Sequence, residues 1–178
     1  MNATPSPRVF PAVWSRGLRI ISGLATLWVG FFCPVGMLMS AGRGGPWFFP
    51  WLALAGPAAV LAALAFRIRR YDVDGDHLRI VRPGWSTRVP LAGLESVEFS
   101  PGAFDRAWRI CGNGGFFSYS GWFYQRPHGL FRAWVTDPAR AVTLRLGRRR
   151  IVVSPEPPLE FVEVLAARLR NRSVVRVS

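Results

Sequence analysis

Two long apolar stretches stand out in the first third of the chain. Residues 20–39 and 47–66 are each twenty residues without a charged side chain, and a short glycine-rich segment separates them. As helices they would each be about 30 Å long, which matches the hydrocarbon core of a bilayer. The pattern therefore predicts a two-helix transmembrane hairpin over residues 17–68, preceded by a cytoplasmic tail at 1–16.

Two other interpretations of these stretches, a cleaved signal peptide and a pair of buried core helices, fit less well. The first stretch is longer than the apolar region of a signal peptide and lacks a convincing small-residue cleavage site. Neither stretch has the polar face that core helices of this length would show. Gly23, Ala25 and Gly30 offer a small-residue surface on which the two helices, or another copy, could pack closely.

The arginines around the hairpin predict its orientation. Only Arg43 lies in the connecting turn, whereas six arginines flank the outer ends: Arg8, Arg16, Arg19, Arg67, Arg69 and Arg70. Cytoplasmic segments next to membrane spans carry an excess of basic residues. We therefore expect a multi-pass protein of the cell inner (plasma) membrane with both termini in the cytoplasm.

From Tyr71 onward the pattern changes to short stretches in which apolar and polar residues alternate. Turn-forming pairs such as Asp74-Gly75 and Gly147-Arg148 separate these stretches. The predicted strands are residues 77–82, 85–89, 94–99, 121–125, 130–135, 141–146 and 149–153. About seven short strands without helices between them indicate an antiparallel sandwich or barrel. We interpret the glycine-rich residues 112–115 as a loop between strands.

One amphipathic helix is predicted near the end of the chain, over residues 159–170. Its apolar stripe consists of Leu159, Val162, Leu165 and Leu169. Proline before the helix, glutamate in its first turns and arginine in its last turn agree with the helix dipole. We place this domain at residues 69–172 and a C-terminal tail at 173–178.

The plan of about seven strands and one C-terminal helix resembles a pleckstrin-homology (PH) domain. Segments similar to the bacterial PH-like domain family are residues 71–80, 89–97, 114–123, 133–137 and 152–161. Members of that family commonly follow a pair of membrane spans. The resemblance implies an N-terminal transmembrane α-hairpin plus an α+β PH-like domain, and it implies no established activity. The loop Asp74-Gly75-Asp76 is acidic where phosphoinositide-binding PH domains carry basic residues, which argues against phosphoinositide binding.

The net charge of +13 rests on arginine alone, because the chain has no lysine. Residues 1–70 contain seven arginines and no acid, and the rest contains sixteen arginines and ten acids, so the two parts carry +7 and +6. Phosphate recognition is one interpretation, since guanidinium binds phosphate in a bidentate fork. A genome whose base composition favours arginine codons is the other, and the high content of Ala, Gly, Pro and Val agrees with it.

No group of residues predicts catalysis or metal binding. A calcium loop that starts at Asp72 would need glycine and glutamate where the chain has His77 and Pro83. Residues 112–115 lack the Lys-Ser/Thr that follows a phosphate-binding loop. The two cysteines and two histidines lack the spacing of zinc ligands. We expect no catalytic residues, no cofactor and no metal, and therefore a protein that is not an enzyme.

Two groups of arginines are candidates for contact with anionic lipid or with a partner. The densest cluster consists of Arg145, Arg148, Arg149 and Arg150. Arg67, Arg69 and Arg70 follow the second apolar stretch, and each could gain about 1 kcal/mol from anionic lipid. The alternative for the cluster is a solvated hairpin tip whose charges limit aggregation.

Aromatic residues are dense between Trp108 and Tyr124. With the arginines among them they could form a stacking platform for single-stranded nucleic acid. Core packing with a rim that touches the membrane is the simpler interpretation.

These observations predict a membrane-anchored, PH-like module without enzymatic activity, integral to the lipid bilayer. We expect it to mediate protein–protein interaction or self-association (a homo-oligomer) at the cytoplasmic face. The alternative is a sensor or binder of anionic phospholipid headgroups that acts through the arginine cluster. We expect no nucleic-acid partner.

Overall fold

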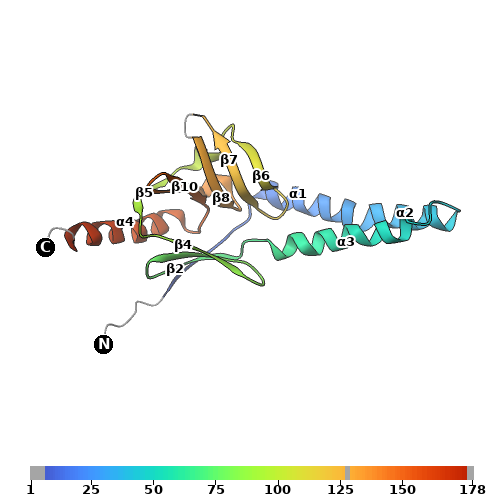
Figure 1. The fold of residues 1–178 in the computed structure, drawn as a ribbon, viewed down its shortest axis with the longest axis horizontal. Coiled ribbons are helices and arrows are strands. Elements are labelled where there is room, and N and C mark those ends of the chain that lie inside the picture. Colours follow the sequence, from blue (N-terminus) through green and yellow to red (C-terminus); the bar gives the residue numbers. More distant parts are fainter. Residues whose placement is uncertain (1–6, 127–128, 176–178) are drawn as a thin grey trace.

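The computed structural model describes residues 7–126 and 129–175. Figure 1 shows a pair of long helices that projects from one side of the molecule, two β-sheets in the middle, and a C-terminal helix on the opposite side. The predicted tail at 173–178 lies partly outside the described residues, as does the start of the N-terminal segment.

The first long helix is continuous from Arg16 to Gly42. It consists of α1 (Arg16–Leu27), the π-helical turn η1 (Trp28–Phe32) and α2 (Cys33–Gly42). Pro34 has no amide hydrogen to donate to the preceding turn, which accounts for the π-helical turn just before it.

The helices differ in how clearly they qualify as membrane spans. The helix Arg16–Gly42 has 27 residues and is long and apolar enough to cross a membrane. Helix α3 (Phe49–Ala65) is equally apolar but has 17 residues, which is the lower limit for a span. Among the described residues there is thus one clear candidate span, and the second predicted span stays a prediction.

Helix α3 lies antiparallel beside the first helix (Figure 1). The closest approach is at Gly56, where an added Cβ atom would collide with the carbonyl oxygen of Val29 in η1. A Cβ atom at Gly30 would meet Val60 Cγ2 at 3.5 Å, whereas one at Gly23 would meet nothing. Of the two glycines predicted at the helix contact, Gly30 lies there and Gly23 does not.

The first sheet has the strand order β1-β2-β3-β4, and all its neighbours are antiparallel. Its strands are β1 (Arg8–Pro11), β2 (Arg70–Asp74), β3 (His77–Val81) and β4 (Ser86–Pro90). Strand β1 lies in the segment that the sequence analysis assigned to a tail. A four-residue strand with one buried side chain, Phe10, is too short to show a period of its own.

The second sheet has the strand order β5-β9-β10-β8-β7-β6. Its strands are β5 (Leu94–Phe99), β9 (Val142–Leu146), β10 (Arg149–Val153), β8 (Gly129–Val135), β7 (Tyr119–Gln125) and β6 (Trp108–Gly114). The short helices η2 (Pro101–Phe104) and η3 (Pro138–Arg140) connect parts of it. Strands β8 and β10 are parallel, so the prediction of an all-antiparallel arrangement is wrong for this pair. Alternation with period two is the same in parallel and antiparallel strands and does not distinguish them.

Strand β6 takes the place of most of the predicted loop at 112–115. Gly112 lies directly opposite Gly121 in β7, and a Cβ atom on either glycine would collide with a backbone oxygen of the other strand. The glycines therefore permit a close strand pair. The described residues form ten strands where the sequence predicts about seven.

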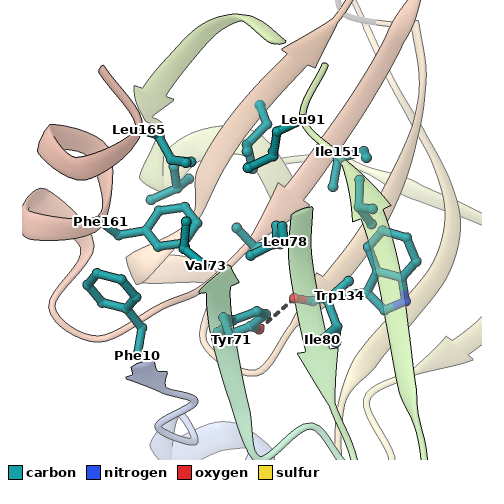
Figure 2. Packing of buried hydrophobic residues seen from close by; sticks show 14 of the residues in the cluster. Phe10, Tyr71, Val73, Leu78, Ile80, Leu91, Trp134, Ile151, Phe161 and Leu165 are labelled. Atoms are coloured by element: carbon teal, nitrogen blue, oxygen red, sulfur yellow. Dashed lines mark hydrogen bonds between the residues drawn. The ribbon is translucent and has the colours of Figure 1, made fainter. Parts of the chain in front are cut away.

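The main core lies between the two sheets and under the C-terminal helix (Figure 2). Tyr71 is fully buried there, and its hydroxyl donates a hydrogen bond of 2.6 Å to the carbonyl of Trp134. This bond joins β2 of the first sheet to β8 of the second.

The C-terminal helix α4 (Pro158–Val175) closes one end of this core. Phe161 and Leu165 are fully buried, and the Phe161 ring meets the Phe10 ring edge-on at 5.1 Å. Leu159, which the predicted stripe placed in the core, is 61% exposed. The helix packs through Phe161 at i and Leu165 at i+4, because these two positions lie one turn apart on the same face.

The domain contacts both helices of the pair. Ser22 of α1 is buried, and its hydroxyl accepts a 2.9 Å hydrogen bond from the amide of Phe117 in the β6–β7 turn. At the end of α3, the Phe66 ring lies edge-on to Trp85 at 5.4 Å. The domain therefore packs against the start of α1 and the end of α3.

Candidate functional site

A tight turn places Arg82 and Trp85 side by side. The residues between them are Pro83 and Gly84, and the amide of Arg82 donates a 2.9 Å hydrogen bond to the carbonyl of Trp85. The guanidinium of Arg82 lies over the Trp85 ring, 4.1 Å from its centre, and its Nη1 donates to the hydroxyl of Thr87 at 2.8 Å. The local β-hairpin between β3 and β4 thus fixes a stacked arginine at its tip.

A second arginine lies between two tryptophans on the facing sheet. Arg132 and Trp134 are two residues apart on β8 and therefore share a face. Trp122 lies directly opposite Arg132 on β7. The Arg132 guanidinium is 4.6 Å from the centre of the Trp134 ring and 5.6 Å from that of Trp122.

These residues line two adjoining cavities that share Arg132 and Trp134 as a common wall. The proximal cavity, of about 410 Å³, is lined by Ala63, Phe66, Arg82, Trp85, Gly112, Asn113, Ser120, Gly121, Arg132 and Trp134. The distal cavity, of about 520 Å³, is lined by Thr87, Arg88, Val89, Pro90, Trp122, Leu130, Arg132, Trp134, Arg148, Arg149, Arg150 and Ile151. We call the two together the arginine groove.

The arginine groove is acid-free. Neither cavity includes an aspartate or a glutamate in its lining, whereas three further cavities of the molecule each include one. Among the described residues, no ion pair involves Arg82, Arg88, Arg132, Arg148 or Arg149. Uncompensated guanidinium groups next to apolar and aromatic walls favour an anionic ligand with an apolar part.

Arg82 is the most buried cation of the groove. The residue is only 5% exposed, and its Nε has no hydrogen-bond partner. Burial lowers the pKa of Arg82 from its usual value, Tyr71 partly raises it, and the charge of Arg132 lowers it further. Arginine nevertheless keeps its charge at neutral pH. Burial of an unpaired charge costs several kcal/mol, while stacking on tryptophan returns about 1–2 kcal/mol, so an anion would stabilise this site.

The proximal cavity begins at the helix pair. Ala63 and Phe66, which line it, belong to the second apolar stretch, and Phe66 forms the C-terminal cap of α3. A ligand in this cavity would therefore contact both the end of an apolar helix and the arginines of the domain.

The structure brings together only some of the arginines that the sequence analysis singled out. Arg148, Arg149 and Arg150 line the distal cavity. Arg145 lies opposite Arg150, on the same face of the β9–β10 hairpin, and pairs with Glu95 at 3.8 Å. Arg145 lines neither cavity, so only three of the four arginines belong to the groove.

The arginines at the end of α3 are also dispersed. Arg70 pairs with Asp72 through Nε at 3.0 Å, which compensates its charge. Arg69 is exposed, and Arg67 is half-buried in the connection between α3 and β2. None of the three lines either cavity of the groove.

Sequence reasoning missed Arg82, Arg88 and Arg132. A local signal existed for two of them: the Pro83-Gly84 turn sets Arg82 opposite Trp85, and Arg132 precedes Trp134 by two residues on a strand. Their convergence could not be foreseen, because it depends on how the two sheets meet.

Part of the aromatic middle of the chain is exposed and part is buried, and the predicted contact of the exposed rim with a membrane stays a prediction. Trp108 is 74% exposed, and Tyr124 and Leu130 are 41% and 54% exposed. They form one row across β6, β7 and β8, because Trp108 lies opposite Tyr124 and Tyr124 lies opposite Leu130. Phe117 and Phe123 are buried, as the prediction requires.

Among the described residues, no three His, Cys, Asp or Glu side chains come together in a way that could hold a metal ion. Cys33 and Cys111 are both exposed and free.

Two β-sheets around one core, closed at one end by a C-terminal helix, define the class of protein as a PH-like domain joined to an apolar helix pair. The chain belongs to the bacterial PH domain family, which it matches over residues 69–169, more than half of its length. This match confirms the resemblance stated from the sequence segments. No curated protein matches the chain. No solved structure matches it either.

Proposed function

We propose that this protein is a membrane-anchored PH-like module, without enzymatic activity, that binds the headgroup of an anionic phospholipid in the arginine groove. The observation that carries this proposal is the position of Arg82. It is a buried cation without a carboxylate partner, in a cavity whose other wall is the end of an apolar helix.

The proposal includes a membrane hairpin formed by both long helices. A 17-residue helix spans about 25 Å, and flanking residues or local thinning of the bilayer accommodate the small deficit. The excess of arginine outside the turn then puts both termini in the cytoplasm of a multi-pass inner-membrane protein. In this orientation the arginine groove opens at the inner leaflet.

A lipid could reach the groove without leaving the bilayer. Its phosphate would meet Arg82 and Arg132, and its glycerol and upper acyl chain would lie against Phe66 and Trp85. Contacts between arginine and phosphate are charge-assisted, and each is worth about 1.5–3 kcal/mol. Diffuse attraction of surface arginines to the leaflet is weaker, at about 1 kcal/mol per residue.

Native mass spectrometry of the full chain, released from a nonionic detergent, tests this proposal. Adducts with phosphatidylglycerol should exceed those with phosphatidylcholine at equal concentration. Arg132→Gln should weaken phosphatidylglycerol binding about 10-fold or more, which corresponds to one lost contact of about 1.4 kcal/mol. Arg145→Gln removes the same charge outside the groove and serves as the matched control, with less than a twofold change expected.

Two results would contradict the proposal. One is equal retention of the anionic and the zwitterionic lipid by the unaltered protein. The other is an equal loss in Arg132→Gln and Arg145→Gln, which would mean that net charge alone attracts the lipid.

A second candidate function is binding of a protein partner, and the exposed row Trp108, Tyr124 and Leu130 favours it. Edge strands of β-sheets and exposed apolar patches commonly mark interaction surfaces. Strand β6 pairs only with β7 and is the edge of its sheet. Arg106 and Arg126 lie beside Trp108 and Tyr124 around one cavity, so an acidic partner complements the row better than a second copy of this basic chain.

The protein-binding function is tested by isolation of the full chain from its native membrane. A stoichiometric acidic protein should co-purify with the unaltered chain and with Arg145→Gln, and should be lost in Trp108→Ser. A homo-oligomer that Trp108→Ser dissociates would instead assign the row to self-association. Recovery of a bare monomer would count against both forms of the idea.

A further inference from the structure

The guanidinium groups of the arginine groove fall into two sets. Arg82 belongs to the proximal cavity, and Arg88, Arg148 and Arg149 belong to the distal cavity. Arg132 lies on the common wall and is available to both. The groove therefore offers two places for a negative charge, in two cavities that share Arg132 and Trp134.

A single phosphate group does not use both sets. Cavities of about 300–1,000 Å³ commonly hold a whole small ligand, and each of these two cavities, of about 410 and 520 Å³, falls in that range. A phosphate is one tetrahedral group, so it contacts the arginines of one cavity only. With a phosphate in the proximal cavity, Arg88, Arg148 and Arg149 would still lack an ion-pair partner among the described residues.

The apolar walls differ between the cavities in a way that orders the ligand. The proximal cavity begins at Ala63 and Phe66 of the apolar helix α3, whereas no residue of the helix pair lines the distal cavity. A lipid that enters from the bilayer therefore places its first phosphate in the proximal cavity. The distal cavity then receives a polar group of the same lipid that lies beyond the first phosphate, on the side away from the acyl chains.

We propose that the preferred ligand of the arginine groove is a phospholipid that carries two phosphate groups, one for each set of arginines. This inference rests on the proposed function, because it assigns the ligand class of the same groove. The second phosphate binds as part of an already bound molecule, at a high effective concentration, so a two-phosphate lipid gains more affinity than two separate one-phosphate lipids.

Competition in native mass spectrometry of the full chain tests this inference. The probes are dioleoyl phosphatidylglycerol phosphate, whose second phosphate is the terminal group of the headgroup, and dioleoyl phosphatidylglycerol, at equal total phosphate. Phosphatidylglycerol phosphate should bind at least 10-fold more tightly than phosphatidylglycerol. The double variant Arg148→Gln/Arg149→Gln should remove this advantage while phosphatidylglycerol binding changes less than threefold. The double variant Arg109→Gln/Arg145→Gln loses the same charge at exposed sites outside the groove and should keep the advantage.

The outcomes separate the inference from the function on which it rests. If both anionic lipids bind with equal affinity per phosphate and phosphatidylcholine does not bind, the two-phosphate inference is overturned and the lipid-binding function stays in place. Failure of both anionic lipids to bind would overturn both. Displacement of phosphatidylglycerol phosphate by inorganic pyrophosphate at the same concentration would overturn the assignment to a lipid, since a soluble diphosphate would then be the ligand.

Discussion

Tyr71 is the residue that couples the two sheets next to the arginine groove. Its hydroxyl donates to the carbonyl of Trp134, and Trp134 stacks with Arg132 on the shared wall of the two cavities. Ser154 also lies within hydrogen-bond reach of the Tyr71 hydroxyl, at 3.4 Å. Burial raises the pKa of Tyr71 from 10.0 to about 12, partly offset by the hydrogen bonds with Ser154.

The stability of the protein should therefore fall at high pH through Tyr71. The folded state favours the neutral phenol, so this stabilisation is complete below pH 10 and is lost as the pH rises through about 12. The loss is on the order of 2–3 kcal/mol. Thermal unfolding of the full chain in nonionic detergent, followed by circular dichroism from pH 8 to pH 12, measures it.

Tyr71→Phe is the reference for this measurement. It should be about 1 kcal/mol less stable than the unaltered protein near pH 8, because the hydrogen bond to Trp134 is lost. The difference should shrink or reverse toward pH 12, since phenylalanine does not ionise. Parallel pH profiles for the two proteins would show that Tyr71 does not titrate in the folded state as described.

At the level of elements, the helix pair depends on a close approach of backbones. Gly56 of α3 faces the Val29 carbonyl in η1, and the Pro34 ring lies 3.4 Å from the position of an added Cβ atom. The π-helical turn that precedes Pro34 thus packs directly against Gly56, and the absence of a side chain at Gly56 makes this contact possible. This contact sets how the two helices enter the domain, and α3 leads into β2 almost at once.

Gly56→Ala should weaken the helix pair. Its Cβ atom cannot be accommodated without a backbone shift, and overpacking of this kind costs about 1–3 kcal/mol. Gly23→Ala adds the same methyl group where the structure has open space and should be neutral or slightly stabilising. The midpoint of unfolding in sodium dodecyl sulfate, measured for both variants in mixed micelles, provides the comparison. Equal midpoints for the two variants would refute the described contact.

Elements with a strong local pattern were predicted well, and elements without one were missed. The stretches at 94–99 and 149–153 are strands with the predicted bounds, because alternation and turn residues are both present. Strand β1 is too short to show a period, and β6 is exposed and rich in glycine. Both strands exist because a neighbouring strand pairs with them, which is information that a single segment does not contain.

At the scale of the whole molecule, the arginine groove is assembled from distant parts of the chain. Arg82 is on the β3–β4 turn of one sheet, Arg132 is on β8 of the other, and Phe66 caps the apolar helix α3. The sequence predicted arginines at the membrane side of the domain and identified Arg148, Arg149 and Arg150. It did not separate Arg145 from them, because the ion pair of Arg145 with Glu95 depends on the pairing of β9 with β5.

The contacts between domain and helices give this groove a fixed place relative to the helix pair. Ser22 of α1 binds the β6–β7 turn, and Phe66 of α3 meets Trp85. The exposed row that starts at Trp108 lies at the opposite end of β6 and β7 from the Ser22 contact. Tyr119 and Tyr124 are five residues apart along β7, which corresponds to about 17 Å. Trp108 and the proximal cavity therefore lie toward opposite ends of β6 and β7, whereas Leu130 belongs both to the row and to the lining of the distal cavity.

The central claim is that an anionic phospholipid places its headgroup in the arginine groove. The most direct test is photocrosslinking of the full chain in nanodiscs that contain phosphatidylglycerol with a photoreactive headgroup, followed by mapping of the modified peptides. The account predicts adducts on residues 82–90 and 130–134 that Arg132→Gln removes and Arg145→Gln retains. Adducts spread equally over the outer face around Arg145, or unaffected by Arg132→Gln, would contradict it.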